Sequence, residues 1–452
     1  MSKTKHTTPL ITLTLLFFMW GFLTCMNDIL IPYLKAVFDL EYWQAMLVQF
    51  AFFGAYFIGS LLYFLYSIKF GDPINKIGYK SGMVIGLGIA AIGCFLFYPA
   101  AQFVSYTFFL SALFVLGLGF TLLQISANPY VSILGDEASA SSRLNLVQAF
   151  NSLGTTIAPV LGGYLIFEFF FDNTSGAAAI KTPYLIFGIL FILVALLISK
   201  IKLPQFTNND LVERKAGALQ HSNLTYGILA IFVYVGGEVA IGSFLINFIG
   251  LEEIIGADEA LATKYLAFYW GGAMIGRFSG ALSMSAMNPT KKYLTMMLLS
   301  ALSYVLIFSI SGFTFQTTLP YLGLMVLNFI AFILGKSYAG RTLGIFALLC
   351  IFLIMGTMFS SGRLAMWLLI GVGLFNSIMW PNIFTLAISG LGKYTSQGSS
   401  LLVMAILGGA LIPVFQGGIA DVFGVQISFI IPLLCYVYIL FYGWVGSTKK
   451  KF

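Results

Sequence analysis

The stretch Gly154-Thr155-Thr156-Ile157-Ala158-Pro159 returns in edited form as Gly408-Gly409-Ala410-Leu411-Ile412-Pro413, 254 residues later. A pair of glycines follows each copy, Gly162-Gly163 and Gly417-Gly418. Nearer the N-terminus, Phe53–Gly59 matches Trp270–Gly276 at a shift of 217. One match between apolar segments arises easily by chance. Several matches in the same order indicate an internal duplication, which is common among proteins that move solutes across membranes.

The composition is that of a membrane protein. Hydrophobic residues make up 59% of the 452 residues and charged residues only 9%, too few to cover the surface of a soluble domain of this size. The charges are clustered, and apolar runs of about 18–28 residues separate them, long enough to cross about 30 Å of hydrocarbon as helices. The chain is therefore expected to be an all-α, polytopic membrane protein embedded in a lipid bilayer.

The apolar runs divide into two sets. The first set predicts six spans, at 10–37, 44–68, 81–99, 106–134, 143–170 and 183–200. A polar stretch at 201–222 follows and is expected to be a cytoplasmic loop between domains. The second set predicts eight spans, at 223–250, 261–287, 291–311, 319–335, 342–359, 364–390, 396–420 and 425–447.

The repeat shifts locate the two surplus spans. Matches before residue 287 align at 217 and matches after residue 380 align at 252–254, and the difference of about 37 residues is the length of one tight transmembrane hairpin. We assign the insertion to about 288–337. The prediction is a six-helix bundle at 1–200, the loop at 201–222, and a second bundle at 223–452 that contains the hairpin, fourteen spans in all.

The positive charges set the orientation. With a cytoplasmic N-terminus, only Lys35, Lys181, Lys264 and Arg363 of the 23 Lys and Arg residues fall outside. This asymmetry follows the positive-inside rule and places both termini in the cytoplasm of a multi-pass inner-membrane protein. It also explains the net charge of +7 without a nucleic-acid partner. The four cysteines lie within apolar runs without metal-ligand spacing, so we predict no cofactor from them.

Three ionisable residues fall inside predicted spans: Asp28, Glu238 and Arg277. Because a charge in hydrocarbon is costly, each is a functional candidate. The alternative for Asp28 is a carboxylate near the interface that bonds a neighbouring helix. Glu238 follows two glycines, which admit either a neighbouring helix or a substrate. Arg277 lies toward the inner end of its span, where a structural or gating charge is expected.

Uncharged polar residues form a second pattern. The pairs Gln124 and Asn128, and Gln148 and Asn151, each lie along one helix face, and Asn376 occupies the corresponding region of the second half. Amides donate and accept hydrogen bonds, which suits a ligand made of hydroxyl groups, although they also commonly bond neighbouring helices.

Prolines and tryptophans add to the polar pattern. Pro129 and Pro381 each free the carbonyl four residues back, at Ile125 and Ser377. Trp270 and Trp380 lie deep in spans, where they stack on a sugar ring or pack in the core.

These residues belong to motifs that resemble the fucose–galactose–glucose:cation symporter family of the major facilitator superfamily. The matching motifs are Asn27-Asp28-Ile29-Leu30-Ile31-Pro32, Ala127–Val131, Ser142–Gly154, Gly373–Met379 and Gly390–Gly398. The likeness covers essentially the whole chain except about 288–337. It implies the major facilitator fold, with two pseudo-symmetric six-helix bundles, and a likeness to the glucose/galactose branch.

The resemblance implies roles for single residues. Asp28, beside Asn27, matches the family's coupling carboxylate, and Gln148 and Asn151 match its sugar-contacting amides. Fucose permeases carry a proton-transferring glutamate where this chain has Gln124, which cannot titrate. We therefore expect a hexose symporter, monomeric, for glucose or galactose, with sodium favoured over a proton as coupling cation and Asp28 as the candidate sodium ligand. From its position in its span rather than from the resemblance, Glu238 is a candidate substrate contact and the reserve ion site.

Other functions remain to be weighed. A passive sugar uniporter needs no intramembrane carboxylate, and a proton-coupled hexose or fucose symporter differs only in its ion. An enzyme embedded in the membrane needs a nucleophile or a metal cluster in the spans, and the sequence supplies neither. A sensor is expected to carry a sizeable soluble domain, whereas the longest loop has about 20 residues.

Overall fold

The computed structural model describes residues 7–40, 44, 47–163, 180–201, 203–204 and 216–448, and every regular element in these ranges is helical. Within them, the side chains of residues 7–8, 27–29, 31–33, 35–36, 159–163 and 259–260 are not described. Most of the predicted loop at 201–222 therefore lies outside the described residues.

Helices occupy all fourteen predicted spans. Twelve segments of the described chain are long and apolar enough to cross a membrane. Two further helices of similar length, α7 (Ala140–Gly163) and α10 (Glu259–Ser283), carry more polar residues and account for the remaining spans. The predicted all-α membrane fold with an extra hairpin is thus confirmed, because helices occupy both halves and the insertion.

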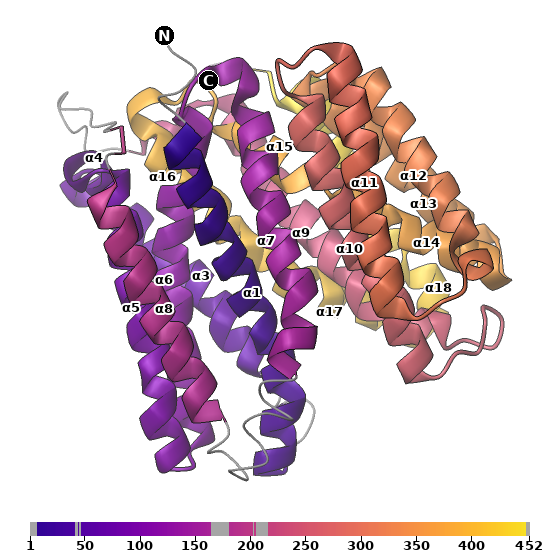
Figure 1. The fold of residues 1–452 in the computed structure, drawn as a ribbon, viewed down its shortest axis with the longest axis horizontal. Helices are drawn as coiled ribbons and strands as arrows, with labels where there is room; N and C mark the ends of the chain where they lie inside the picture. The colour runs from indigo at the N-terminus through magenta and orange to yellow at the C-terminus, as the bar shows by residue number, and fades with distance from the viewer. Residues whose placement is uncertain are drawn as a thin grey trace. The chain divides into compact units, whose positions relative to one another are not determined.

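The chain divides into two compact units. Unit 1 comprises residues 1–134, 153–218 and 391–404. Its helices α3, α5, α6 and α8 lie side by side (Figure 1). The elements of unit 1 that precede the loop at 201–222 are α1 (Thr7–Phe38), α3 (Leu47–Phe70), α4 (Pro73–Ile77), α5 (Tyr79–Gln102), α6 (Tyr106–Ile133), the second part of α7, and α8 (Lys181–Lys200). The short η7 (Gly392–Tyr394) and α16 (Thr395–Met404) complete it.

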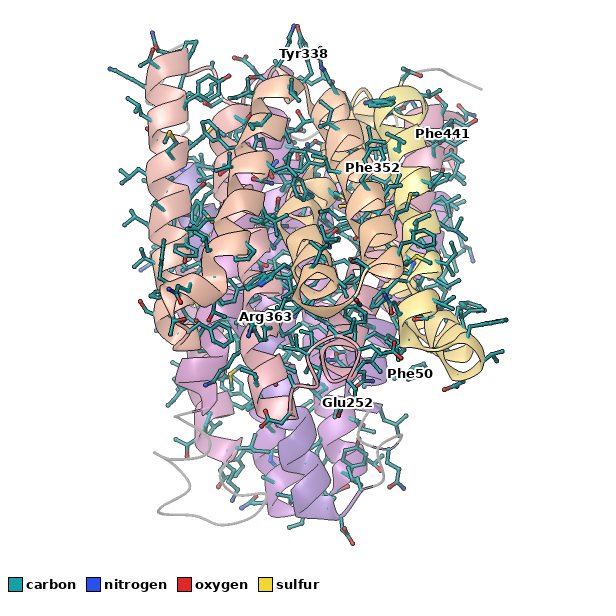
Figure 2. The ribbon with its side chains drawn as sticks, turned by 90° about the vertical axis from the view of Figure 1, so that its right-hand side faces the viewer. Phe50, Glu252, Tyr338, Phe352, Arg363 and Phe441 are labelled. Carbon is teal, nitrogen blue, oxygen red and sulfur yellow. The ribbon has the colours of Figure 1, made fainter. Side chains whose placement is uncertain are left out.

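Unit 2 comprises residues 135–152, 219–390 and 405–452. Its helices are the first part of α7, α9 (Ser222–Ile249), α10, α11 (Pro289–Ser311), α12 (Phe315–Gly335), α13 (Ala339–Phe359), α14 (Gly362–Asn376), α15 (Met379–Ile388), α17 (Gly408–Phe423), α18 (Val425–Ser428) and α19 (Ile430–Phe441). Figure 2 shows Glu252 and Arg363 at one end of this unit and Tyr338, between α12 and α13, at the other. Phe352 and Phe441 point outward from it, as apolar side chains that face lipid do.

Two segments group with the unit of the other half of the sequence. Residues 135–152, which begin α7, belong to unit 2, and residues 391–404, which include α16, belong to unit 1. The changes of unit fall after Ser152 and after Met404, 252 residues apart, which is the shift of the internal repeat. The domain boundaries predicted at 200 and 223 follow the two sequence repeats. The compact units differ from the repeats, because each unit includes one half-helix from the repeat of the other unit.

In each repeat, an equivalent glycine lies where two helix backbones approach closely. A Cβ placed on Gly154 would lie 2.3 Å from the carbonyl oxygen of Phe18 in α1. A Cβ on Gly408 would lie 1.9 Å from the carbonyl oxygen of Phe232 in α9. Only glycine permits so close an approach, and the two glycines are the first residues of the repeated stretch. The internal repeat in the sequence is therefore matched by an equivalent close helix–helix contact in each repeat.

Candidate functional site

The described polar core of unit 2 is centred on Asn376, at the end of α14. Its amide nitrogen donates to the hydroxyl of Tyr269 at 2.8 Å, and its amide oxygen accepts from the hydroxyl of Tyr436 at 2.5 Å. The hydroxyl of Tyr234 donates to its main-chain carbonyl at 3.3 Å. Asn376 is buried, and these partners use one donor and one acceptor of its side chain and fix its orientation.

Glu238 joins this network from α9. The hydroxyl of Tyr269 donates to the main-chain carbonyl of Glu238 at 2.9 Å, and the hydroxyl of Tyr234 interacts with its side chain. The positive charge of Arg277, from α10, acts on the same carboxylate. Glu238 is only partly buried. Two of the three ionisable residues predicted inside the spans therefore interact within one unit.

Arg277 also satisfies the helix break that Pro381 causes. Its Nε donates to the carbonyl oxygen of Ser377 at 3.0 Å, the carbonyl that the proline leaves without a helical partner. Its Nη1 donates to the hydroxyl of Ser152 in α7. The structural role expected for Arg277 is consistent with these contacts.

The two predicted tryptophans differ in exposure. Trp270 is 42% exposed, and its ring meets the ring of Tyr269 edge to face at a centroid distance of 5.0 Å. The ring of Trp380 is 9% exposed and stacks on Phe384 at 4.9 Å. Trp270 therefore keeps exposed surface, whereas much of Trp380 is packed.

Gln124 and Asn128 lie in α6 of unit 1. The side chain of Gln124 is hydrogen-bonded to Tyr56, which also interacts with Trp20. Asn128 is completely buried, and neither atom of its amide has a hydrogen-bond partner among the described residues. Such unsatisfied amides are rare in folded proteins.

The remaining predicted residues divide between the units. Gln148 and Asn151 lie in the part of α7 that belongs to unit 2, where Gln148 is buried and Asn151 partly buried. Asn27 and Asp28 lie in α1 of unit 1, and their side chains are among those not described. The structure thus brings Glu238, Asn376 and Trp270 together through the tyrosines. The assignment of these residues to a sugar site stays a prediction.

The tyrosines are the residues that sequence reasoning missed. Tyr234 stands four residues before Glu238, so it shares a helix face with it, and Tyr269 adjoins Trp270. Both signals were available. Tyr436 is 60 residues from Asn376 in the chain, and nothing in the sequence links them.

The described residues contain no group of three or more His, Cys, Asp or Glu side chains arranged to hold a metal ion. This leaves Asp28 untested, because its side chain is not described.

Comparisons with known proteins cover the whole chain. Residues 10–339 match the profile of the Major Facilitator Superfamily. The chain is 44% identical to the Glucose/galactose transporter of Brucella abortus, over 99% of this chain and 96% of that protein. It is 41% identical to the Putative glucose/galactose transporter of Helicobacter pylori, over the full length of both. It is 32% identical to the L-fucose-proton symporter of Escherichia coli, over 96% and 92%.

A solved structure agrees with these sequence matches. The crystal structure of FucP, a major facilitator superfamily transporter in the outward conformation, superposes with a TM-score of 0.76 at 30% identity, over 98% of this chain and 99% of that one. Such coverage includes both halves of the duplicated architecture. The chain belongs to the major facilitator superfamily, within its fucose–galactose–glucose:cation symporter family and that family's glucose/galactose branch.

Proposed function

We propose that this chain is a secondary active symporter that takes up a hexose, glucose or galactose, together with a cation across the bacterial cytoplasmic membrane. Two relatives at 44% and 41% identity that carry glucose and galactose in their names support the substrate class. Membership in a transporter family, and not an enzyme family, agrees with the absence of catalytic motifs in the sequence.

The observation that carries the proposal is the polar network of unit 2. Carboxylate, amide and phenol groups from four helices, α9, α10, α14 and α19, meet inside an apolar bundle. Groups that both donate and accept suit a ligand rich in hydroxyls, and Trp270 offers an aromatic face for the apolar side of a sugar ring. Gln148 and Asn151 of α7 are the proposed direct sugar contacts, with Gln124, Asn128 and Trp380 as further candidates.

Asp28 is the proposed coupling residue. The positive charge of Arg277 acts on Glu238 and disfavours a second cation there, and Asp28 is the other carboxylate that the sequence places within the spans. Sodium is the ion we expect, because Gln124 cannot titrate. A proton is the alternative, since a relative at 32% identity is named an L-fucose-proton symporter. Asn27 would supply an amide oxygen to sodium.

Counterflow of labelled glucose in liposomes that contain the purified chain tests the substrate class. We expect exchange with unlabelled glucose or galactose. Gln148→Ala and Asn151→Ala should each weaken sugar binding by about 1–3 kcal/mol, because sugar hydroxyls lose their partners. Gln426→Ala is the control, since that amide bonds main-chain carbonyls of Thr357 and Ser360 at the end of unit 2. Unchanged glucose affinity in both site variants would remove these amides from the site.

A further inference from the structure

The inserted hairpin packs on the helices that carry the polar network. Ile307 of α11 fills the space beside Gly271 of α10, where a Cβ would lie 2.5 Å from its Cδ1. The equivalent glycine of the first repeat, Gly54, has nothing within 4 Å of such a Cβ. The hairpin therefore packs on Gly271, whereas no described atom lies that close to the equivalent position of the first repeat.

Helix α12 bridges α10 and α14. The hydroxyl of Tyr321 donates to the carbonyl of Phe268 in α10 at 2.9 Å. Leu324 lies against Gly371 of α14, where a Cβ would lie 2.9 Å from its Cδ1. Near the loop of the hairpin, the ring of Phe313 meets the ring of Tyr265 in α10 at 4.5 Å. One inserted helix pair thus holds two helices of the original bundle.

Asn328 makes the polar contact nearest to the network. Its side chain is buried, and its amide nitrogen donates to the carbonyl oxygen of Leu374 at 3.1 Å. Leu374 lies two residues before Asn376, where α14 ends, and the hydroxyl of Ser377 donates to the same carbonyl at 2.7 Å. A donor from the hairpin therefore fixes the last turn of α14 at the point where that helix breaks.

We propose that the α11–α12 hairpin clamps α10 to α14, and that Asn328 is a positioning residue that sets the place of Asn376 in the sugar site. The proposal rests on the proposed function in that Asn376 serves sugar binding. Asn376 lies at the end of α14, and its hydrogen-bond partner Tyr269 lies in α10. The hydrogen bond between them therefore requires that the spacing of the two helices is kept. Asn328 itself does not touch the network.

The test compares two buried hydrogen bonds of the hairpin. Asn328→Leu removes the donor to α14. Thr318→Val, the matched control, removes the bond between Thr318 and Tyr304, which lies wholly within the hairpin. In glucose counterflow we expect Asn328→Leu to raise KM about threefold to tenfold, the effect of about one hydrogen bond, with the maximal rate nearly retained. Thr318→Val should lower the unfolding temperature while leaving KM within about twofold.

A second variant and a second measurement keep the outcomes separate. Asn328→Ala also removes the donor and introduces neither a charge nor a new hydrogen-bonding group, and it carries the test if Asn328→Leu does not fold. Hydrogen exchange of the main-chain amides at 373–378 should be faster in either Asn328 variant than in Thr318→Val. Unchanged KM and unchanged exchange would overturn the clamp. If the wild type exchanges no hexose, the proposed function fails, and the hydrogen exchange alone decides the clamp.

Discussion

Arg277 holds together three parts of unit 2 that are far apart in the sequence. Its guanidinium donates to the carbonyl of Ser377 and to the hydroxyl of Ser152, and its charge acts on Glu238. Five donors in a planar group allow one side chain to do this, and lysine has neither the number nor the geometry. The charge of Glu238 is therefore tied to the position of both the α14–α15 break and α7.

The interaction between Glu238 and Arg277 predicts non-additive mutations. Glu238→Gln and Arg277→Gln should each lower the free energy of unfolding, because each leaves one charge in the bundle without its opposite. The double variant should lose less than the sum of the two, with a coupling energy of about 0.5–3 kcal/mol. Thermal unfolding in detergent, followed by tryptophan fluorescence, measures all four proteins. Additive losses would show that the two charges act independently.

Single residues were predictable where local chemistry decides. The sequence predicted a free carbonyl at Ser377 from Pro381, and this carbonyl accepts from Arg277, but the identity of the donor depends on how α10 packs. The spacing of Gln124 and Asn128 predicted one helix face. It did not predict that Gln124 would bond Tyr56 while Asn128 has no partner among the described residues, because burial depends on neighbouring helices.

At the scale of elements, Asp72 holds the start of α16 in unit 1. Its carboxylate accepts from the hydroxyl of Tyr63 at 2.5 Å, from the hydroxyl of Ser396 at 2.5 Å and from the main-chain nitrogen of Ile74 at 3.0 Å. It thereby caps α4 and ties it to α3 and α16. Burial raises the pKa of Asp72 above its ordinary value of 3.8, while the hydrogen bonds oppose that rise.

This raised pKa gives a pH dependence with a definite sign. Between pH 3.8 and the higher folded-state pKa, the folded chain binds more protons than the unfolded chain at Asp72. The contribution of Asp72 to stability should therefore fall as pH rises through that window and stay level above it. Asp72→Asn should remove this contribution at little cost at pH 7, since an amide can replace the same contacts. Asp72→Ala should cost about 1–3 kcal/mol.

Unfolding temperatures of the three proteins measured from pH 4 to pH 8 check this prediction. The wild type minus Asp72→Asn difference isolates the carboxyl group, because other titrating groups contribute equally to both. A difference that stays constant across the range, or one that favours the wild type increasingly as pH rises, would contradict the assigned sign.

The repeated glycines predict matched effects in two pairs of helices. Gly154→Ala and Gly408→Ala should both destabilise the fold, because the added Cβ meets a main-chain carbonyl of α1 or α9 that cannot move alone. Gly418→Ala is the control: it lies in α17, nothing lies within 4 Å of its Cβ, and alanine favours a helix by up to about 1 kcal/mol. Unfolding temperatures measure this, and a neutral Gly154→Ala would refute the close approach.

At the scale of the whole chain, the duplication extends from sequence to packing. The repeat at a shift of 252–254 predicts equivalent helices, and α7 and α16–α17 change unit at residues separated by that shift. Hydrogen bonds mark each exchanged segment: Ser142 donates to the carbonyl of Ala281 at 2.5 Å in unit 2, and Gln397 donates to Ser67 at 3.1 Å in unit 1. A half-helix from each repeat is thus built into the other unit.

The fold was predictable because its determinants are local. Apolar runs set the number and place of the helices, and the difference between the repeat shifts assigns the hairpin to 288–337, where α11 and α12 lie. The exchange of half-helices was not predictable, since it depends on contacts such as Asn145 with Asn382 that join residues 237 positions apart. The role of the hairpin was not predictable either, because no pattern in the sequence indicates the hydrogen bond between Asn328 and Leu374.

The central claim is that sugar uptake is coupled to a cation through Asp28. The most direct measurement is uptake of labelled glucose into liposomes under an imposed inward sodium gradient at constant pH, for the wild type and for Asp28→Asn. The account predicts that the wild type concentrates glucose and that Asp28→Asn does not, while counterflow in Asp28→Asn persists. Uptake driven equally well by a proton gradient without sodium would make this a proton symporter. Concentrative uptake that survives in Asp28→Asn would contradict the claim.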